Sequence, residues 1–180
     1  MKAKKKPQES HSLLPLRPGV MNRLYWRNGP PNAADWKRIR HKVLERDDYR
    51  CRMCGHRAVK YMNVHHLGRG DDDKPRNLVT CCVACHAVLH VGRNLALGAI
   101  QIWKSELSQR QIVQRTRRMV RAGKSLKEIK KELRLTRGRL PCASIDYAND
   151  LLVNAGREKR ISLPEPYCAV FVRFKRWQIE

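Results

Sequence analysis

The chain has 180 residues, with 39 lysines and arginines against 16 aspartates and glutamates, and its formal net charge is +23. So large a positive excess is typical of a protein that binds a polyanion, and it predicts nucleic acid as the partner. No run approaches the roughly 18 consecutive apolar residues that a membrane-spanning helix needs, so we expect no membrane partner.

The cysteine usage and the start of the chain indicate a cytoplasmic location. Of the seven cysteines, four stand in Cys-x-x-Cys pairs, which is typical of metal ligands in a reducing compartment rather than of a disulfide framework. The basic stretch 1–7 is not followed by the apolar run of a secretory signal. The length allows one ordinary domain or two small ones, and we expect two modules, residues 32–100 and 105–180, after an N-terminal arm.

The arm, residues 1–31, is predicted to be basic and flexible, because its lysines and prolines come with no sustained hydrophobic period. Leu24, Tyr25 and Trp26 form an apolar cluster within this arm. Their side chains could pack on the body of the protein, which is the commoner fate of such a cluster, or stack on a base.

An amphipathic helix is predicted over residues 33–46, after a start signal at Pro30, Pro31 and Asn32. The apolar residues that recur at helical spacing are Trp36, Ile39, Val43 and Leu44. The opposite face carries basic residues, which are either solvated or in contact with phosphates: Lys37, Arg38, Arg40, Lys42 and Arg46.

Eight metal-seeking side chains follow within forty residues. Two Cys-x-x-Cys pairs enclose a His-His doublet, and the second pair runs into two further histidines: Cys51, Cys54, His65, His66, Cys82, Cys85, His86 and His90. Four thiolates in two such pairs meet the tetrahedral demand of a structural zinc ion. The histidines then remain for a second, catalytic metal ion.

A hairpin followed by a helix is predicted between and after the two cysteine pairs. One strand should end with residues 64–67, and residues 77–80 should form the second strand after a turn-rich loop. Adjacent residues on a strand point to opposite faces, so His65 and His66 should face different surroundings. The acidic run at 71–73 is expected to be a solvated loop tip outside the site.

The helix is expected over about residues 83–91, with Gly92 as its stop signal. His86 and His90 are four residues apart, so they lie on one helical face and can hold a single ion. The alternative is that His90 is only a helix-end residue favoured by the helix dipole. Cys81, Cys142 and Cys168 are expected to pack as small apolar residues. His11, His41 and His56 lie outside the metal positions.

The order of these motifs resembles the HNH nuclease family in its four-cysteine zinc form, over about residues 35–91. The motifs are a Cys-x-x-Cys pair, a His-His doublet on a strand, a glycine-bearing loop, the pair Asn77-Leu78, and a second Cys-x-x-Cys pair that runs into His86 at the start of a helix. The resemblance implies a ββα-metal fold, phosphodiester hydrolysis and phage or mobile-element biology. It assigns His65, His86 and His90 to the catalytic ion, His66 to the general base and Asn77 to orienting His66 by a hydrogen bond. In some family members an asparagine in this motif ligates the metal instead.

The chemistry that the resemblance implies needs one divalent ion and one base. The ion polarises the phosphate and stabilises the leaving oxygen, while neutral His66 takes the proton from the attacking water. Three imidazoles suit zinc, nickel, cobalt or manganese better than magnesium, which prefers oxygen ligands. Because a tightly bound ion need not be the one that supports turnover, the catalytic ion stays open among Mg²⁺, Mn²⁺, Ni²⁺ and Zn²⁺.

The module at 105–180 is predicted to be helical, basic and DNA-binding. One helix covers residues 111–120, and the capping-box pattern at 125–128 opens a second. A third helix is expected from about Pro141 to Asn154, because proline is tolerated only in the first turn. The stretch at 135–138 resembles the turn into the recognition helix of a helix-turn-helix unit.

A strand is expected over residues 167–177, paired with the segment at 160–161 as in a small wing. The whole chain is therefore predicted to be an α+β protein, with a ββα-metal hairpin and a winged helix-turn-helix-like module. The residues predicted to contact nucleic acid are Arg69, Arg115, Arg117, Arg118, Arg121 and Lys124.

The leading hypothesis is a metal-dependent DNA endonuclease, in which the arm and the C-terminal module hold duplex DNA while the hairpin cuts it. A non-catalytic, zinc-stabilised DNA-binding protein is the main alternative, and the His65-His66 doublet argues against it. An RNA-directed nuclease is a third reading, because positive charge alone does not distinguish the two backbones. A ribosomal or membrane-surface protein would share the charge but would not account for the cysteine and histidine spacing.

Overall fold

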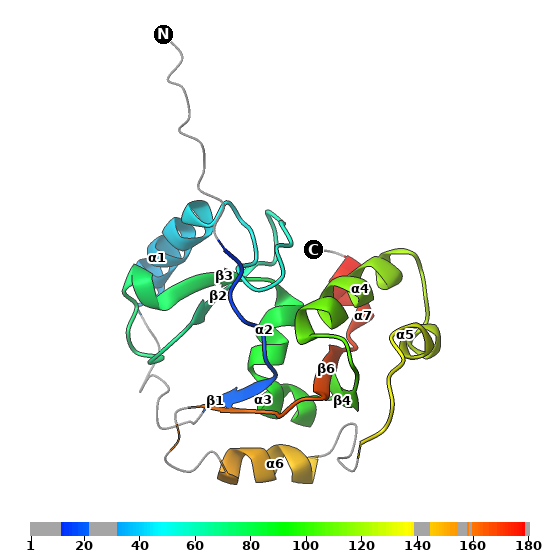
Figure 1. Cartoon of the computed structure of the whole chain (residues 1–180). Helices are drawn as coiled ribbons and strands as arrows, with labels where there is room; N and C mark the ends of the chain where they lie inside the picture. Colours follow the sequence, from blue (N-terminus) through cyan, green and yellow to red (C-terminus); the bar gives the residue numbers. More distant parts are fainter. Residues whose placement is uncertain (1–11, 22–31, 139–144, 155–157, 159, 179–180) are drawn as a thin grey trace.

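The computed structural model describes residues 12–21, 32–138, 145–154, 158 and 160–178. The helices are α1 (Ala33–Arg46), α2 (Val83–Leu89), α3 (Val91–Ala96), α4 (Gln109–Arg121), α5 (Leu126–Glu132), α6 (Ile145–Asn154) and α7 (Phe174–Gln178), with a short 3-10 helix η2 (Pro75–Asn77). The strands are β1 (Gly19–Met21), β2 (Asn63–His66), β3 (Leu78–Cys81), β4 (Ile100–Lys104), β5 (Arg160–Ser162) and β6 (Tyr167–Phe171). They pair as three two-stranded antiparallel sheets, so the fold is mixed α+β (Figure 1).

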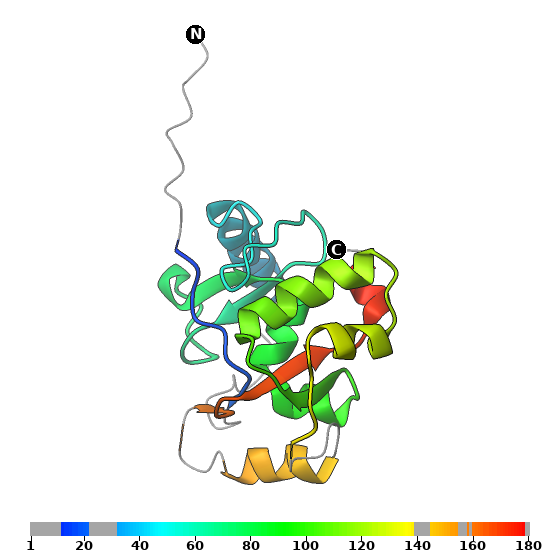
Figure 2. The same cartoon turned by 45° about the vertical axis from the view of Figure 1, so that its right-hand side comes forward.

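The buried apolar side chains of the described residues form one continuous cluster. It includes Leu78 from the predicted hairpin module and Ile112 from the predicted C-terminal module. Strand β4, which lies at the predicted boundary, pairs along its whole length with β6. Helix α4 packs across β6 and α7 (Figure 2). The two predicted modules therefore share a core.

Helix α1 confirms the prediction for residues 33–46. Asn32 is its N-cap, and the side chain of Asn32 accepts a hydrogen bond from the backbone nitrogen of Ala34 at 3.0 Å. Val43 and Leu44 are buried, while Trp36 and Ile39 are half-buried against the core. The helix lies on the β2–β3 hairpin, which separates it from α2 (Figure 1).

The predicted hairpin is present, with His65 opposite Val79 and His66 opposite Leu78. Helix α2 ends one residue before His90, whose backbone is not helical (φ −122, ψ 51), and α3 begins directly after it. The prediction that Gly92 stops the helix is wrong, because Gly92 lies inside α3. A Cβ at Gly92 would lie 3.4 Å from Val20 Cγ2, so this glycine permits close packing rather than a turn.

Part of the predicted arm is folded against the body of the protein, which corrects the prediction for residues 12–21. Leu16 and Val20 are buried, and β1 pairs with β5 near the other end of the chain. The partner strand lies far away in the sequence, and the apolar residues of this segment follow no sustained period: Leu13, Leu14, Leu16, Val20 and Met21. The cluster at 24–26 and His11 lie outside the described residues.

The helices α4 and α5 were predicted, and each begins with a complete capping box. Ser108 and Gln111 form the first, and Ser125 and Glu128 form the second. The third predicted helix is present as α6, although Pro141 and Cys142 lie outside the described residues. None of the helices in the described ranges is long and apolar enough to cross a membrane.

The predicted wing is wrong in both its length and its pairing. Strand β6 stops at Phe171 and α7 follows, with Trp177 buried and its Nε1 donating to the Phe171 carbonyl at 3.0 Å. The strand pairs with β4, whereas β5 pairs with β1. Four consecutive residues of β6, 168–171, are buried, which is typical of a strand covered on both faces rather than of an exposed wing.

Candidate functional site

Four cysteines from two separate segments meet in the core. Cys51 and Cys54 follow α1, while Cys82 is the N-cap of α2 and Cys85 lies in its first turn. All four are buried, and their sulfur atoms lie within 4.8 Å of one another. The Sγ atoms of Cys54 and Cys82 are 3.8 Å apart. Two sulfurs bound to one zinc at about 2.3 Å and a tetrahedral angle would lie about 3.8 Å apart, so the cluster fits a zinc ion.

Local backbone geometry holds the first cysteine pair in a tight loop. The backbone nitrogen of Gly55 donates to the Cys51 carbonyl at 2.8 Å, and the Cys51 nitrogen donates to the His56 carbonyl at 2.8 Å. Gly55 has a φ of +79°, which a residue with a side chain rarely adopts. Glycine directly after the second cysteine is therefore required by the loop.

The ionisation of these thiols favours a bound cation. Burial raises the pKa of Cys82 and of Cys85 well above the ordinary value. Burial also raises the pKa of Cys51, but hydrogen bonds from the neighbouring sulfurs outweigh this and lower it overall. Several thiolates cannot share a buried volume unless a positive charge compensates them, and a divalent ion supplies that charge.

The remaining cysteines in the described residues are buried, as predicted. Cys81 lies beside the four-cysteine cluster but is not one of its members. Cys168 is in strand β6, where burial raises its pKa to about 12. His41 is exposed and its Nδ1 lies 3.1 Å from a carboxylate oxygen of Glu45, so it takes no part in either cluster.

Three histidines form the second cluster. His65 comes from β2, His86 from α2 and His90 from the junction of α2 and α3, and their ring nitrogens lie within 4.8 Å of one another. The Nδ1 of His65 and the Nε2 of His90 are 3.2 Å apart. Two nitrogens bound to one ion at about 2.0–2.1 Å would be separated by about 3.3 Å, so the three residues fit a divalent metal.

The imidazoles of this triad are neutral near pH 7. Burial lowers the pKa of His65 to about 2, and the nearby His90, His86 and Arg160 add to the effect. Burial also lowers the pKa of His86 to about 4 and that of His90 to about 3. A neutral imidazole has the free lone pair that a metal ion requires, so the site is ready to bind one.

His66 points to the other side of the strand, as the alternation predicted. Its Nε2 lies 2.9 Å from the Oδ1 of Asp73, and its ring stacks on Trp36 with the ring centroids 5.7 Å apart and an angle of 11°. The side chain is 20% exposed. The expectation that Asp73 belongs to a solvated loop tip is therefore wrong, because its carboxylate holds the imidazole.

The predicted hydrogen bond between Asn77 and His66 is absent. Within the described structure, the Asn77 side chain accepts from the Gly68 nitrogen at 2.6 Å and donates to the carbonyls of Arg69 and Asp72 at 2.8 and 2.7 Å. Asn77 thus fixes the loop that ends in Asp73. Its influence on His66 passes through the backbone of that loop, not through a direct contact.

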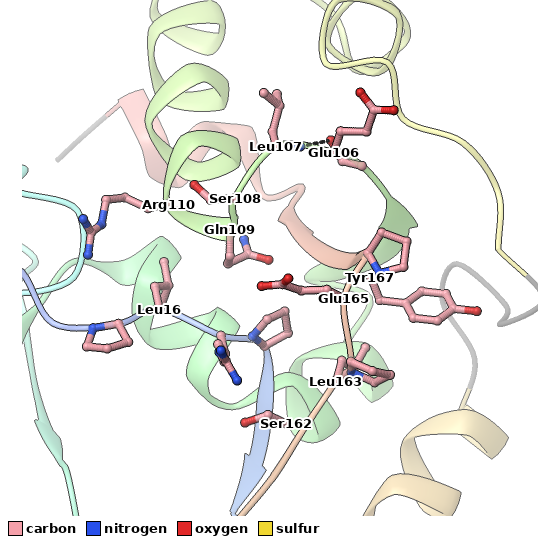
Figure 3. A pocket seen from close by; sticks show the side chains of 16 residues that line it. Leu16, Glu106, Leu107, Ser108, Gln109, Arg110, Ser162, Leu163, Glu165 and Tyr167 are labelled. Carbon is pink, nitrogen blue, oxygen red and sulfur yellow. Dashed lines mark hydrogen bonds between the residues drawn. The ribbon is translucent and has the colours of Figure 1, made fainter.

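The histidine triad and His66 line one cleft of about 480 Å³. Its lining includes His65, His66, His86 and His90 together with Arg93. A second hollow, of about 670 Å³, lies between the segment before β1, the start of α4 and the β5–β6 loop (Figure 3). The described residues that line this second hollow include no histidine or cysteine, so of these two hollows only the first contains the residues of the histidine triad.

The residues predicted to contact nucleic acid fall into three groups. Arg115, Arg118 and Arg121 are exposed on α4. Arg69 and Lys124 form ion pairs with Asp71 and Glu132 respectively. Arg117 is 6% exposed and its guanidinium lies over the Trp177 ring, 4.8 Å from the centroid, so the prediction for this residue is wrong. Its position on the buried face of α4 is visible in the helical spacing of its neighbours.

Three supporting residues of the site are not evident from the sequence. The helical spacing of Trp36 predicts only that it packs on the core, and not that it stacks on His66. The acidic run predicts only that Asp73 is solvated, and not that it contacts His66. The third is Arg160 in β5, whose Nη2 lies 3.1 Å from the Nε2 of His65. No local signal identifies Arg160, because the β1–β5 pairing brings it to the site from the far end of the chain.

Comparisons with models of protein families and with curated proteins give no match for this chain. The geometry of the two clusters and of the cleft is therefore the basis on which a function can be proposed.

Proposed function

We propose that the chain is a metal-dependent DNA endonuclease of the HNH type, in which the four cysteines hold a structural zinc ion and the histidine triad holds a catalytic divalent ion. The observation that carries the proposal is the divided environment of two adjacent histidines. His65 joins a three-imidazole cluster, whereas His66 is held by a carboxylate and a stacked ring on the same cleft. A metal site that only stabilised the fold would not need a neighbouring histidine held by a carboxylate and a stacked ring.

A divalent ion on His65, His86 and His90 would polarise the phosphate and stabilise the leaving oxygen. His66 supplies the proton acceptor. Because an ionised carboxylate only accepts hydrogen bonds, Nε2 of His66 donates to Asp73 and the lone pair lies on Nδ1. That nitrogen takes the proton from the attacking water, and Asp73 then stabilises the resulting imidazolium.

Trp36 and Asn77 position this base without touching the reacting atoms. The indole of Trp36 restricts rotation of the His66 ring, and Asn77 fixes the loop that carries Asp73. The net charge of +23 and the exposed arginines of α4 suit a phosphate backbone as substrate. DNA rather than RNA is the class implied by the family resemblance.

Cleavage of supercoiled plasmid tests the proposal. Purified protein is incubated with plasmid and Mg²⁺, Mn²⁺, Ni²⁺ or Zn²⁺, beside a reaction containing a chelator that leaves the tightly bound zinc in place. We expect nicking or linearisation that needs added metal and is lost in His90→Ala. His41→Ala is the matched control and should cut like the parent, because His41 is exposed and is not a member of the triad.

Two other results would change the assignment. If neither protein cuts and both bind DNA in a salt-sensitive way, the chain is a non-catalytic DNA-binding protein stabilised by zinc. If duplex RNA is cut faster than duplex DNA in a competition assay, the substrate class is wrong although the chemistry stands.

A further inference from the structure

Arg160 brings a positive charge into contact with the histidine triad. It lies in β5 opposite Met21, and its Nη2 is 3.1 Å from the Nε2 of His65. The side chain crosses Gly19, where an added Cβ would lie 3.6 Å from the arginine Cδ and Nε and 3.3 Å from the Ile161 carbonyl oxygen. The absence of a side chain at Gly19 therefore leaves the path by which this guanidinium reaches the site.

The guanidinium has no compensating anion in the described part of the chain. No ion pair joins Arg160 to a carboxylate there, and its buried Nε has no hydrogen-bond partner. The carboxylate that contacts the base side of the site, Asp73, pairs with His66. A half-buried positive charge without an acidic partner is unfavourable, and an anionic ligand would remove that penalty.

We propose that Arg160 binds the phosphate group that is cleaved and stabilises the charge that develops on it. This inference rests on the proposed function. A guanidinium presents a planar fork of donors that matches two oxygens of one phosphate, which an ammonium cannot do. If His65 gives Nδ1 to a metal ion, its Nε2 carries the hydrogen and cannot accept one from Arg160. The donors of Arg160 are then available to the phosphate.

The competing interpretation is a structural role, in which Arg160 only holds the His65 ring in its orientation. The two readings differ in what they predict for metal binding. A brace is needed to keep His65 in place, so its removal would weaken the triad for its ion. A phosphate ligand can be removed while the metal content stays the same.

The experiment compares Arg160→Gln and Arg160→Lys with the parent and with Arg57→Gln. Arg57 is an exposed arginine paired with Asp48, away from the cleft, and it serves as the control. Titration calorimetry measures the affinity of Mn²⁺-loaded protein for inorganic phosphate. Elemental analysis gives the metal content, and a melting curve reports the fold.

We expect Arg160→Gln to weaken phosphate binding by about 10- to 100-fold, which is the range for loss of a charged hydrogen bond. Plasmid cleavage should fall by about 10²- to 10³-fold in kcat/KM, as for loss of a donor to the transition state. Arg160→Lys should recover only part of either loss. Metal content and melting should match the parent, and Arg57→Gln should match it in every assay.

Two results would overturn the inference. One is unchanged phosphate affinity and cleavage in Arg160→Gln, and the other is loss of the triad metal, which would identify a brace. If the parent binds phosphate through Arg160 but cuts no nucleic acid, the anion site stands and the nuclease proposal fails. If the parent cuts plasmid and Arg160→Gln cuts equally well, the nuclease stands and this inference fails.

Discussion

His65 and His66 are neighbours in the sequence but differ in everything that decides their chemistry. His65 is buried among His86 and His90, and its pKa is lowered to about 2 by burial first and by nearby positive groups second. His66 is partly exposed and bonded to Asp73. The two-residue repeat of a β-strand is enough to produce this separation, because it turns adjacent side chains to opposite faces.

Asp73→Asn should lower the kcat of cleavage by about 100-fold or more while KM changes little, since an amide can stabilise the wrong tautomer of the base. The matched control is Asp71→Asn, because Asp71 is an exposed acidic residue of the same loop that pairs with Arg69. Steady-state cleavage of a labelled duplex separates kcat from KM. Equal activity of the two variants would remove Asp73 from the mechanism.

The sequence predicts the metal-seeking residues of the site but not the groups that support them. Cysteine and histidine spacings are local, so Cys51, Cys54, His86 and His90 could be grouped correctly. Asp73 stands in a run of three aspartates, and nothing in that run distinguishes the one that turns inward. The supporting role of Asn77 was predicted with the wrong contact, because its partners are loop backbone atoms that no pattern specifies.

At the scale of elements, the two cysteine pairs join the turn after α1 to the start of α2. A structural zinc ion contributes about 10–16 kcal/mol of apparent free energy in small zinc peptides, far more than the packing of one hairpin. The hairpin that carries His65 and His66 lies between these elements. A zinc ion held by the four cysteines would therefore stabilise the scaffold of the histidine cluster without lining its cleft.

Cys85→Ser should lose the zinc ion and unfold the hairpin, because serine supplies no thiolate to a buried tetrahedral site. Cys168→Ala is the control, as this buried cysteine lies in β6 outside the cluster. The Cys168→Ala variant should keep its zinc ion and melt in a single transition. Zinc content by elemental analysis and a melting curve check both variants, and a full zinc complement in Cys85→Ser would refute the assignment.

Asp47 ties α1 to the hairpin. Its carboxylate accepts from Arg46 at 2.9 and 3.0 Å and from the Thr80 nitrogen at 2.8 Å, and the side chain is fully buried. Asp47→Asn should lower the free energy of unfolding by about 2–3 kcal/mol at pH 7, the range for a hydrogen-bonded charge. Urea denaturation measures this. Asp35→Asn, an exposed acid on α1, should change it by less than about 0.5 kcal/mol.

The contribution of Asp47 also has a defined pH dependence. Burial raises its pKa, but the hydrogen bonds from Arg46 and Thr80 outweigh burial and lower the pKa below the ordinary value of 3.8. The stabilisation is therefore present above pH 3.8 and is lost as the pH falls through the lower folded-state pKa. The stability difference between the parent and Asp47→Asn should be constant from pH 7 to 5 and should shrink in stronger acid.

At the scale of the whole molecule, pairings between distant segments assemble the fold. Strand β1 near the start pairs with β5 near the end, and β4 pairs with β6. Periodicity and capping patterns identify α1, α4 and α5 because these depend on nearby residues. They cannot identify a strand partner more than a hundred residues away, which is why neither the true pairing of β5 nor the position of Arg160 follows from the sequence.

The basic surface of α4 should hold DNA through phosphate contacts. Replacing Arg115, Arg118 and Arg121 with alanine should weaken binding and reduce the slope of log K against log salt by about 0.9 for each phosphate that the protein no longer neutralises. Arg57→Ala is the control and should leave the slope unchanged, because Arg57 pairs with Asp48. Fluorescence anisotropy at several salt concentrations gives the slopes. An unchanged slope in the triple variant would show that DNA binds to another face of the protein.

In the mechanism that we propose, His66 provides the base while the rest of the site binds metal and DNA. The most direct test compares the parent with His66→Ala for plasmid cleavage, DNA affinity, metal content and melting, on proteins prepared identically. We expect cleavage to be abolished and the DNA affinity, metal content and melting curve of His66→Ala to match those of the parent. Cleavage at the parental rate by a folded, metal-loaded His66→Ala would contradict this mechanism.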